Sequence, residues 1–92
     1  MREEQVKKNL KANLKQIGAY YYMPVPMGYG AASVDFFICH QGRFFAIETK
    51  RPGVEEATTR QKCVLRAVAA AGGGWWVEND PELHTTKERI RP

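Results

Sequence analysis

The sequence has no long apolar run, few cysteines and few histidines. No stretch of its 92 residues approaches the length of a membrane span, and the N-terminal segment MREEQVKKNL lacks the apolar block of a signal peptide. Cys39 and Cys63 show no CxxC or metal-ligand spacing. We therefore expect two free, buried thiols in a reducing compartment, one on a strand and one on a helix. These absences argue against a membrane protein, a disulfide framework and a cysteine-based metal site.

The length and charge of the chain set two further expectations. A chain of 92 residues makes a single domain over residues 1–92, with one core and little surplus stability. The formal net charge of +4 favours an anionic partner such as nucleic acid. Many ordinary domains are mildly basic, so the charge alone does not identify that partner.

The pattern of apolar residues predicts a helix over residues 3–17. The apolar residues that form its stripe are Val6, Leu10, Leu14 and Ile17. Gly18 then ends the helix. Glu3 falls on the same stripe, where an acid is unusual, although it also complements the helix dipole. Residues 20–26 predict a first strand that ends at prolines, and residues 28–33 predict a loop of small residues.

The segment from Ser33 to Lys50 predicts a β-hairpin, because two runs of β-branched and aromatic residues flank Gln41-Gly42. A two-residue turn would pair His40 with Arg43, so that paired residue numbers sum to 83. Asp35 would then lie opposite Glu48, with Lys50 on the same face. The other face carries a core surface of Val34, Phe36, Ile38, Phe45 and Ile47. A bulge or a longer turn would change this pairing.

The C-terminal half predicts a second helix and a last strand. Thr58 and Gln61 have capping-box spacing before a helix over residues 59–71, which the three glycines at 72–74 end. The residues that form its buried stripe are Val64, Leu65 and Val68. Trp75 to Val77 predict a strand in which at least one tryptophan points inward. The order αβββαβ predicts an α/β fold, in which a mixed sheet has helices on its faces. For the polar tail after this strand, both a short helix and an irregular segment remain open.

The predicted site combines two acids and a lysine. Facing carboxylates weaken a sheet unless a cation binds them. Asp35, Glu48 and the backbone carbonyl of Thr49 offer the oxygen ligands that Mg²⁺ prefers, and Lys50 can orient water or meet a phosphate. The alternative is a solvated salt bridge at a strand end.

Basic residues around the predicted site suggest a phosphate track. They are Arg43, Arg51, Arg60 and Lys62. The alternative is that the last two are solvated helix residues. His40 and His84 receive no role, because a lone histidine beside a turn is more often plain surface.

Several segments together resemble one nuclease family. They are MREEQVKKNL, G-x-x-x-x-D from Gly30 to Asp35, GRFFAIETK, TTRQ and AAGGGWWVEND. In this order they resemble the VRR-NUC branch of the PD-(D/E)XK nucleases. The resemblance implies a restriction-endonuclease-like αβββαβ core and a Mg²⁺- or Mn²⁺-dependent DNA endonuclease. It points to a site of Glu3, Asp35, Glu48, Lys50 and Gln61, with Glu3 reaching the metal through a water.

The resemblance also implies a setting and a partner. Stand-alone members look phage- or bacteria-borne, which places the protein in the cytoplasm, and are associated with homodimers that cut branched DNA such as Holliday junctions. Two departures stand out: Val34 replaces the usual proline before the aspartate, and Thr49 takes a place where an apolar residue is common. Neither removes a ligand. A nicking, flap or exonuclease, a catalytically silent DNA-binding module and a plain interaction domain are the alternatives.

Overall fold

The computed structural model describes residues 2–25 and 34–90. Its elements are α1 (Glu3–Gln16), β1 (Tyr20–Tyr22), β2 (Phe36–His40), β3 (Arg43–Thr49), α2 (Thr59–Ala70), β4 (Gly74–Glu78) and α3 (His84–Arg89). The predicted order αβββαβ is confirmed, and the polar tail contains α3. The predicted loop of small residues at 28–33, with Gly30, lies outside the described residues.

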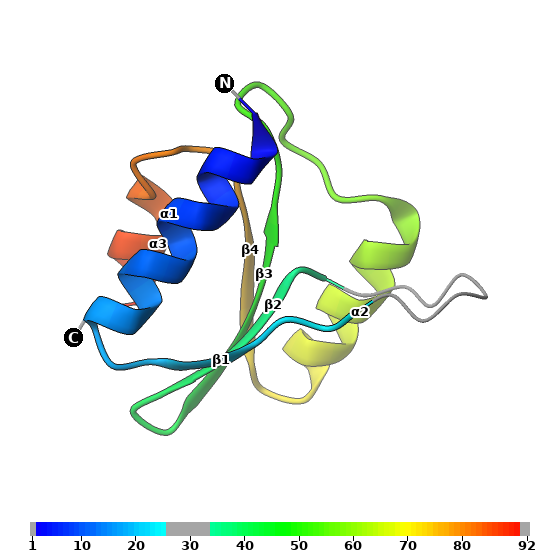
Figure 1. The fold of residues 1–92 in the computed structure, drawn as a ribbon. Coiled ribbons are helices and arrows are strands. Elements are labelled where there is room, and N and C mark those ends of the chain that lie inside the picture. The colour runs from blue at the N-terminus through cyan, green and yellow to red at the C-terminus, as the bar shows by residue number, and fades with distance from the viewer. Residues whose placement is uncertain (1, 26–33, 91–92) are drawn as a thin grey trace.

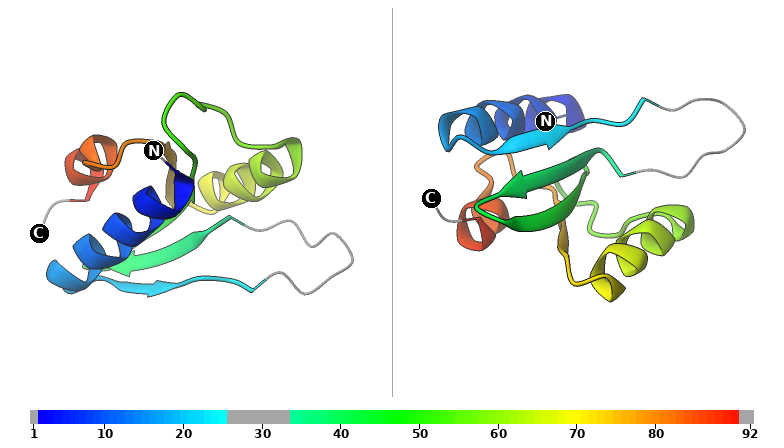
Figure 2. Two further views of the ribbon diagram at one scale, coloured as in Figure 1. Left: turned by 45° about the horizontal axis from the view of Figure 1, so that its top comes forward. Right: turned by 90° about the horizontal axis from the view of Figure 1, so that it is seen from below.

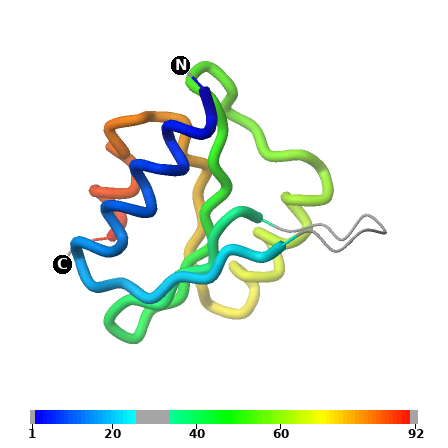
Figure 3. The backbone as a smooth tube through the Cα atoms, in the orientation of Figure 1, coloured from blue at the N-terminus to red at the C-terminus, as the bar shows by residue number. Residues whose placement is uncertain are grey.

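The four strands form one mixed sheet in the order β1-β2-β3-β4. The first three strands are antiparallel neighbours, and β3 pairs with β4 in parallel. The parallel pair requires a crossover, which α2 provides. Figure 1 shows α1 and α3 on one face of the sheet and α2 on the other, and the tube in Figure 3 follows the chain from β3 through α2 into β4.

Most of the core lies between the sheet and α1. The stripe of α1 is buried as predicted at Val6, Leu10 and Leu14, because these residues recur on one side of the helix. They join Phe36, Ile38, Phe45, Ile47 and Trp76 of the strands, and Leu83 and Ile90 beside α3. Trp76 is 4% exposed and Trp75 is 39% exposed, so one tryptophan points inward as expected.

A smaller cluster lies on the α2 face. Its buried members are Val34, Ala46, Ala57 and Leu65. Of the predicted α2 stripe only Leu65 is fully buried, while Val64 and Val68 are half-buried, since α2 covers β3 and β4 but leaves the β1–β2 side open. The two views of Figure 2 show this uneven cover.

The hairpin turn fixes the register of β2 and β3. Gln41 and Gly42 both have positive φ, 51° and 78°, as the two central residues of a type I′ turn require. The pairs run from His40↔Arg43 to Phe36↔Ile47, and every pair sums to 83. The predicted two-residue turn is therefore confirmed.

The predicted boundaries of four elements are wrong. The first strand ends at Tyr22 and not at residue 26, because Pro24 has no N–H to donate to a neighbouring strand. Helices α1 and α2 each end one residue early, where Ile17 and Ala71 are the C-caps. The last strand is longer than predicted and begins at Gly74.

Four predicted side-chain environments are also wrong. Val34 packs with Ala46 on the α2 face, because it precedes β2 and strand alternation does not apply to it. Cys39 and Cys63 are free, and lie on a strand and a helix as expected, but both are exposed. His40 is 5% exposed, since it shares a face with Phe36 and Ile38. Its Nε2 atom has no partner among the described residues.

Candidate active site

Asp35 and Glu48 meet where β2 begins and β3 ends. Asp35 precedes β2 by one residue, so the predicted ladder pair is replaced by a bond from the Asp35 backbone N–H to Glu48 Oε1, at 3.0 Å. Asp35 Oδ2 accepts from the backbone N–H of Thr49, at 3.0 Å, and from its hydroxyl. These bonds hold the first carboxylate at the end of the neighbouring strand.

Glu48 carries the more deeply buried carboxylate. The residue is 2% exposed, and its Oε2 atom lies 3.3 Å from Lys50 Nζ. The same oxygen accepts a hydrogen bond from the Gln61 amide. Strand β3 therefore presents the E-x-K acid and lysine together, while α2 supplies a neutral donor to the acid.

Gln61 serves two structures at once. The Thr58 hydroxyl accepts from the Gln61 N–H, and Gln61 Oε1 accepts from the Thr58 N–H at 2.8 Å, which completes the predicted capping box. The remaining amide nitrogen of Gln61 is the group that donates to Glu48. The first turn of α2 is thereby fixed to the acid cluster.

Helix α1 adds a residue that the sequence had not indicated. Lys7 Nζ lies 3.5 Å from Asp35 Oδ1 and 3.8 Å from Glu3 Oε2. Glu3 therefore reaches the cluster through Lys7, which is four residues further along the same helix. The E-x-x-x-K spacing was the available signal, because residues four apart share a helix face. We call the set Glu3, Lys7, Asp35, Glu48, Thr49, Lys50 and Gln61 the acid cluster.

The acid cluster changes the acidity of Glu48. Burial, reinforced by the nearby Asp35 carboxylate, raises the pKa of Glu48 from 4.5 to about 7, against the lowering effect of Lys50. A carboxyl with a pKa near 7 exchanges its proton at neutral pH, and a cation beside it would favour the charged form. This is the behaviour of a carboxylate that needs a positive partner.

The predicted basic residues are scattered. Arg43 lies at the opposite end of β3 from Glu48, with its guanidinium 5.2 Å from the centre of the Phe45 ring. Lys62 Nζ lies 3.5 Å from Glu56. Arg51 and Arg60 are exposed at the loop after β3 and at the start of α2. Arg51, Arg60 and Lys62 each neighbour an acid-cluster residue in the chain, but Lys62 is paired with Glu56 and Arg43 lies at the far end of β3, so a continuous phosphate track does not follow.

The donor set of the acid cluster fits a hard divalent cation held by few protein ligands. Within residues 2–25 and 34–90, no three histidine, cysteine, aspartate or glutamate side chains gather to hold a metal by themselves. Mg²⁺, however, is commonly bound by one or two carboxylates, with waters and substrate phosphates completing its shell. Asp35 and Glu48 are two adjacent carboxylates whose outer oxygens already attract the ammonium groups of Lys7 and Lys50. Both would hold such an ion.

The loop that joins Lys50 to α2 is hydrogen-bonded to the residue that follows β4. Asn79 Nδ2 donates to the carbonyl of Val54 at 3.0 Å. The buried Glu78 carboxylate accepts from the N–H and hydroxyl of Thr86, which fixes α3 beside the end of β4. Sequence patterns did not indicate these contacts, because each joins two segments whose relative position only the folded structure determines.

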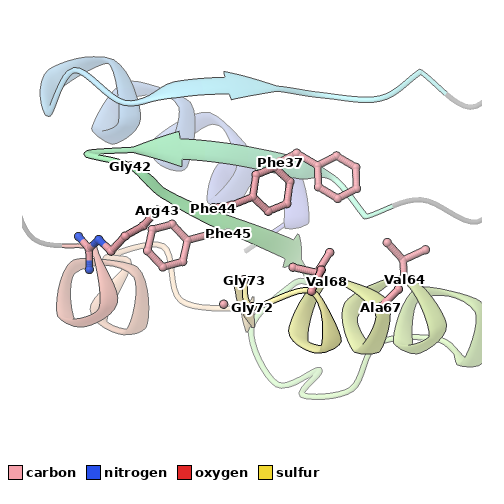
Figure 4. A pocket seen from close by; sticks show the side chains of 12 residues that line it. Phe37, Gly42, Arg43, Phe44, Phe45, Val64, Ala67, Val68, Gly72 and Gly73 are labelled. Atoms are coloured by element: carbon pink, nitrogen blue, oxygen red, sulfur yellow. The ribbon is translucent and has the colours of Figure 1, made fainter.

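A broad groove lies away from the acid cluster. It has a volume of about 710 Å³ and lies between the β2–β3 hairpin and α2, and none of the acid-cluster residues line it. Figure 4 shows Phe37 and Phe44 facing Val64 and Val68 across it. The two rings are stacked, with their centres 5.8 Å apart.

Comparisons with known proteins add no relative. No family model matches the chain, and no curated protein or solved structure matches it. Among the described residues, none of the helices has the length and apolar character needed to cross a bilayer.

Proposed function

We propose that the protein is a metal-dependent DNA endonuclease that hydrolyses phosphodiester bonds at the acid cluster. The observation that carries this proposal is the meeting of Asp35, Glu48 and Lys50, with Glu48 buried and its pKa raised to about 7. A buried acid pair weakens a small domain unless a ligand uses it. The resemblance of the sequence to VRR-NUC nucleases supports the same activity.

The residues of the acid cluster have separate roles in this proposal. Asp35 and Glu48, with the carbonyl of Thr49, would hold Mg²⁺ or Mn²⁺, and the bound ion supplies an activated water and neutralises phosphate charge. Lys50 presents its ammonium beside Glu48, where it orients the attacking water or meets a phosphate oxygen. Gln61 holds Glu48 in place. Arg51 and Arg60 are exposed, each beside an acid-cluster residue in the chain, and would contact the DNA backbone.

The substrate class in this proposal is branched DNA, cut by a homodimer inside the cell. The test is incubation of pure protein with linear duplex, single-stranded, flap and four-way junction DNA in Mg²⁺, Mn²⁺ or EDTA. We expect junction cutting with either metal and none in EDTA. If the protein cut only flaps or DNA ends, these would be its substrates and the proposal of branched junctions would be wrong. Binding without cutting under every condition would leave a DNA-binding module and overturn the enzymatic proposal.

Lys50→Ala should lower the cleavage rate by about a hundred-fold or more, because it removes positive charge facing the water and phosphate. Its affinity for Mg²⁺ should remain, since the ammonium does not bind the ion. Single-turnover cleavage and calorimetry measure the two quantities. Lost metal affinity with intact turnover would contradict the role of Lys50.

Glu3→Gln should reduce cleavage by about ten-fold, less than a change at Glu48, because Glu3 reaches the acid cluster only through Lys7. The matched control is Glu4→Gln, an exposed neighbour on the same helix with the same loss of charge. Equal rates for the two variants would return Glu3 to a helix-dipole role.

The dimer of this proposal has a candidate surface. Tyr20, Tyr22 and Phe44 are 66%, 58% and 47% exposed, and they line a hollow that adjoins the groove of Figure 4. Large exposed apolar side chains on a small domain are typical of a self-association surface. A second copy that covers these rings would supply the second site that a junction with two strands to cut requires.

If the dimer forms through this surface, the melting temperature of the protein should rise with its concentration in the micromolar range. Phe44→Glu should make the protein monomeric by light scattering, whereas Cys63→Glu, at an exposed α2 position outside the groove, should not. Mixed dimers of wild type and Glu48→Gln should nick a junction once without resolving it. A wild-type monomer that still resolves junctions would contradict the dimer.

A further inference from the structure

Lys7 places its ammonium group beside the Asp35 carboxylate. Thr49 donates two hydrogen bonds to Asp35 Oδ2, and Lys7 Nζ lies 3.5 Å from the other oxygen, Oδ1. The Lys7 ammonium also lies 3.8 Å from Glu3 Oε2. One ammonium group therefore lies within ion-pair distance of two carboxylates of the acid cluster and balances the charge of only one.

Lys7 and Lys50 differ in how they are held. Lys50 extends from β3, is 16% exposed and lies against the buried carboxylate of Glu48. Lys7 extends from the surface of α1 and is 28% exposed, and its partners Glu3 and Asp35 are 43% and 24% exposed. A lysine on a flexible stem at such a position can turn its ammonium into water. Moving the Lys7 ammonium away from its carboxylates should therefore require less free energy than moving that of Lys50.

The charges of the acid cluster indicate that a divalent cation would displace Lys7 from Asp35. The acid cluster has three carboxylates and two ammonium groups, and so one net negative charge when all five are ionised. A divalent ion that joins them would leave a net positive charge, with Lys7 and the ion facing the same Asp35 oxygen. Two positive charges that contact the same oxygen repel each other strongly.

We infer that Lys7 is a displaceable counter-ion, which holds the acid cluster together without metal and competes with a divalent cation for Asp35. The inference rests on the proposed use of the acid cluster as a metal site. Lys7 thereby sets the concentration at which Mg²⁺ or Mn²⁺ loads the site. Metal affinity is lower than two bare carboxylates would give, because each binding event displaces an ammonium group.

The test is calorimetric titration of the metal-free protein with MgCl₂ and MnCl₂. Lys7→Met keeps much of the stem and removes the charge, and it should bind both ions roughly ten-fold more tightly than wild type. Lys8→Met is the matched control: it removes the same charge from the neighbouring, exposed position and should bind like wild type. Lys7→Arg keeps the charge and should not bind more tightly.

A second measurement uses thermal melting in EDTA. Lys7→Met should melt at a lower temperature than Lys8→Met, because Glu3 and Asp35 lose their counter-ion. Added Mg²⁺ should raise the melting temperature of Lys7→Met by more than that of Lys8→Met. If Lys7→Met does not fold, Lys7→Gln takes its place in both measurements. Unchanged or weaker metal binding by the neutral variant would overturn the counter-ion role. Absence of metal binding by wild type and neutral variant alike would overturn the proposed metal site itself, so the two failures are distinguishable.

Discussion

Glu48→Gln and Asp35→Asn should each reduce DNA cleavage by about a thousand-fold or more, the upper end of the loss when one group that stabilises a transition state is removed. Both changes keep the shape of the side chain and remove a charge that a divalent ion needs. Single-turnover cleavage of a labelled junction in Mg²⁺ measures the effect, and circular dichroism shows whether the fold is retained.

The control for these variants is Glu55→Gln, an exposed acid in the loop after β3, which should cut at the wild-type rate. The folded state should survive in both site variants, since the Gln61 amide and the Thr49 N–H still have an oxygen to meet. Full cleavage by either variant at ordinary Mg²⁺ would remove that residue from the active site.

The stability of the metal-free protein should fall as the pH rises from about 4.5 to about 7. Burial and Asp35 raise the pKa of Glu48 to about 7 in the folded protein, whereas an exposed glutamate titrates near 4.5. The folded state therefore binds this proton more tightly, and its stabilising effect is full below pH 4.5 and lost above 7. A shift of this size corresponds to about 3 kcal/mol of unfolding free energy.

Urea unfolding in EDTA across pH 4.5 to 8 measures this loss. Glu48→Gln has no proton to exchange at this position, so its stability should lack the decline and should equal or exceed that of wild type at pH 8. Saturating Mg²⁺ should remove the decline from wild type, because the ion binds the charged carboxylate. The same decline in Glu48→Gln would show that another group causes it.

Local patterns were sufficient to predict the fold and the meeting of Asp35 with Glu48. The turn at Gln41-Gly42 determines the register of the hairpin. Because paired residue numbers sum to 83, the sequence alone predicted that Asp35 lies beside Glu48. The capping box predicted the start of α2, because both of its bonds join residues three apart. Each of these predictions depends on residues that are close in the chain.

The remaining features depend on which face each helix covers. Strand alternation placed His40 and Cys39 on opposite faces, but only the positions of α1 and α2 decide that His40 is buried and Cys39 exposed. Lys7 was missed for the same reason: its contact with Asp35 exists because α1 crosses the sheet beside the start of β2. Val34 differs because the ladder stops at Phe36.

The two-residue turn at Gln41-Gly42 also limits how the sequence can change. It lies at the far end of the hairpin from Asp35 and Glu48, yet it determines which residues meet there. One residue added to this turn would shift one strand past the other and turn its side chains to the opposite face. We therefore expect natural variants and engineered libraries to tolerate substitutions at Gln41 far better than a single insertion beside it. An inserted residue would separate Asp35 from Glu48 and so abolish the proposed cleavage, with every acid-cluster residue still present.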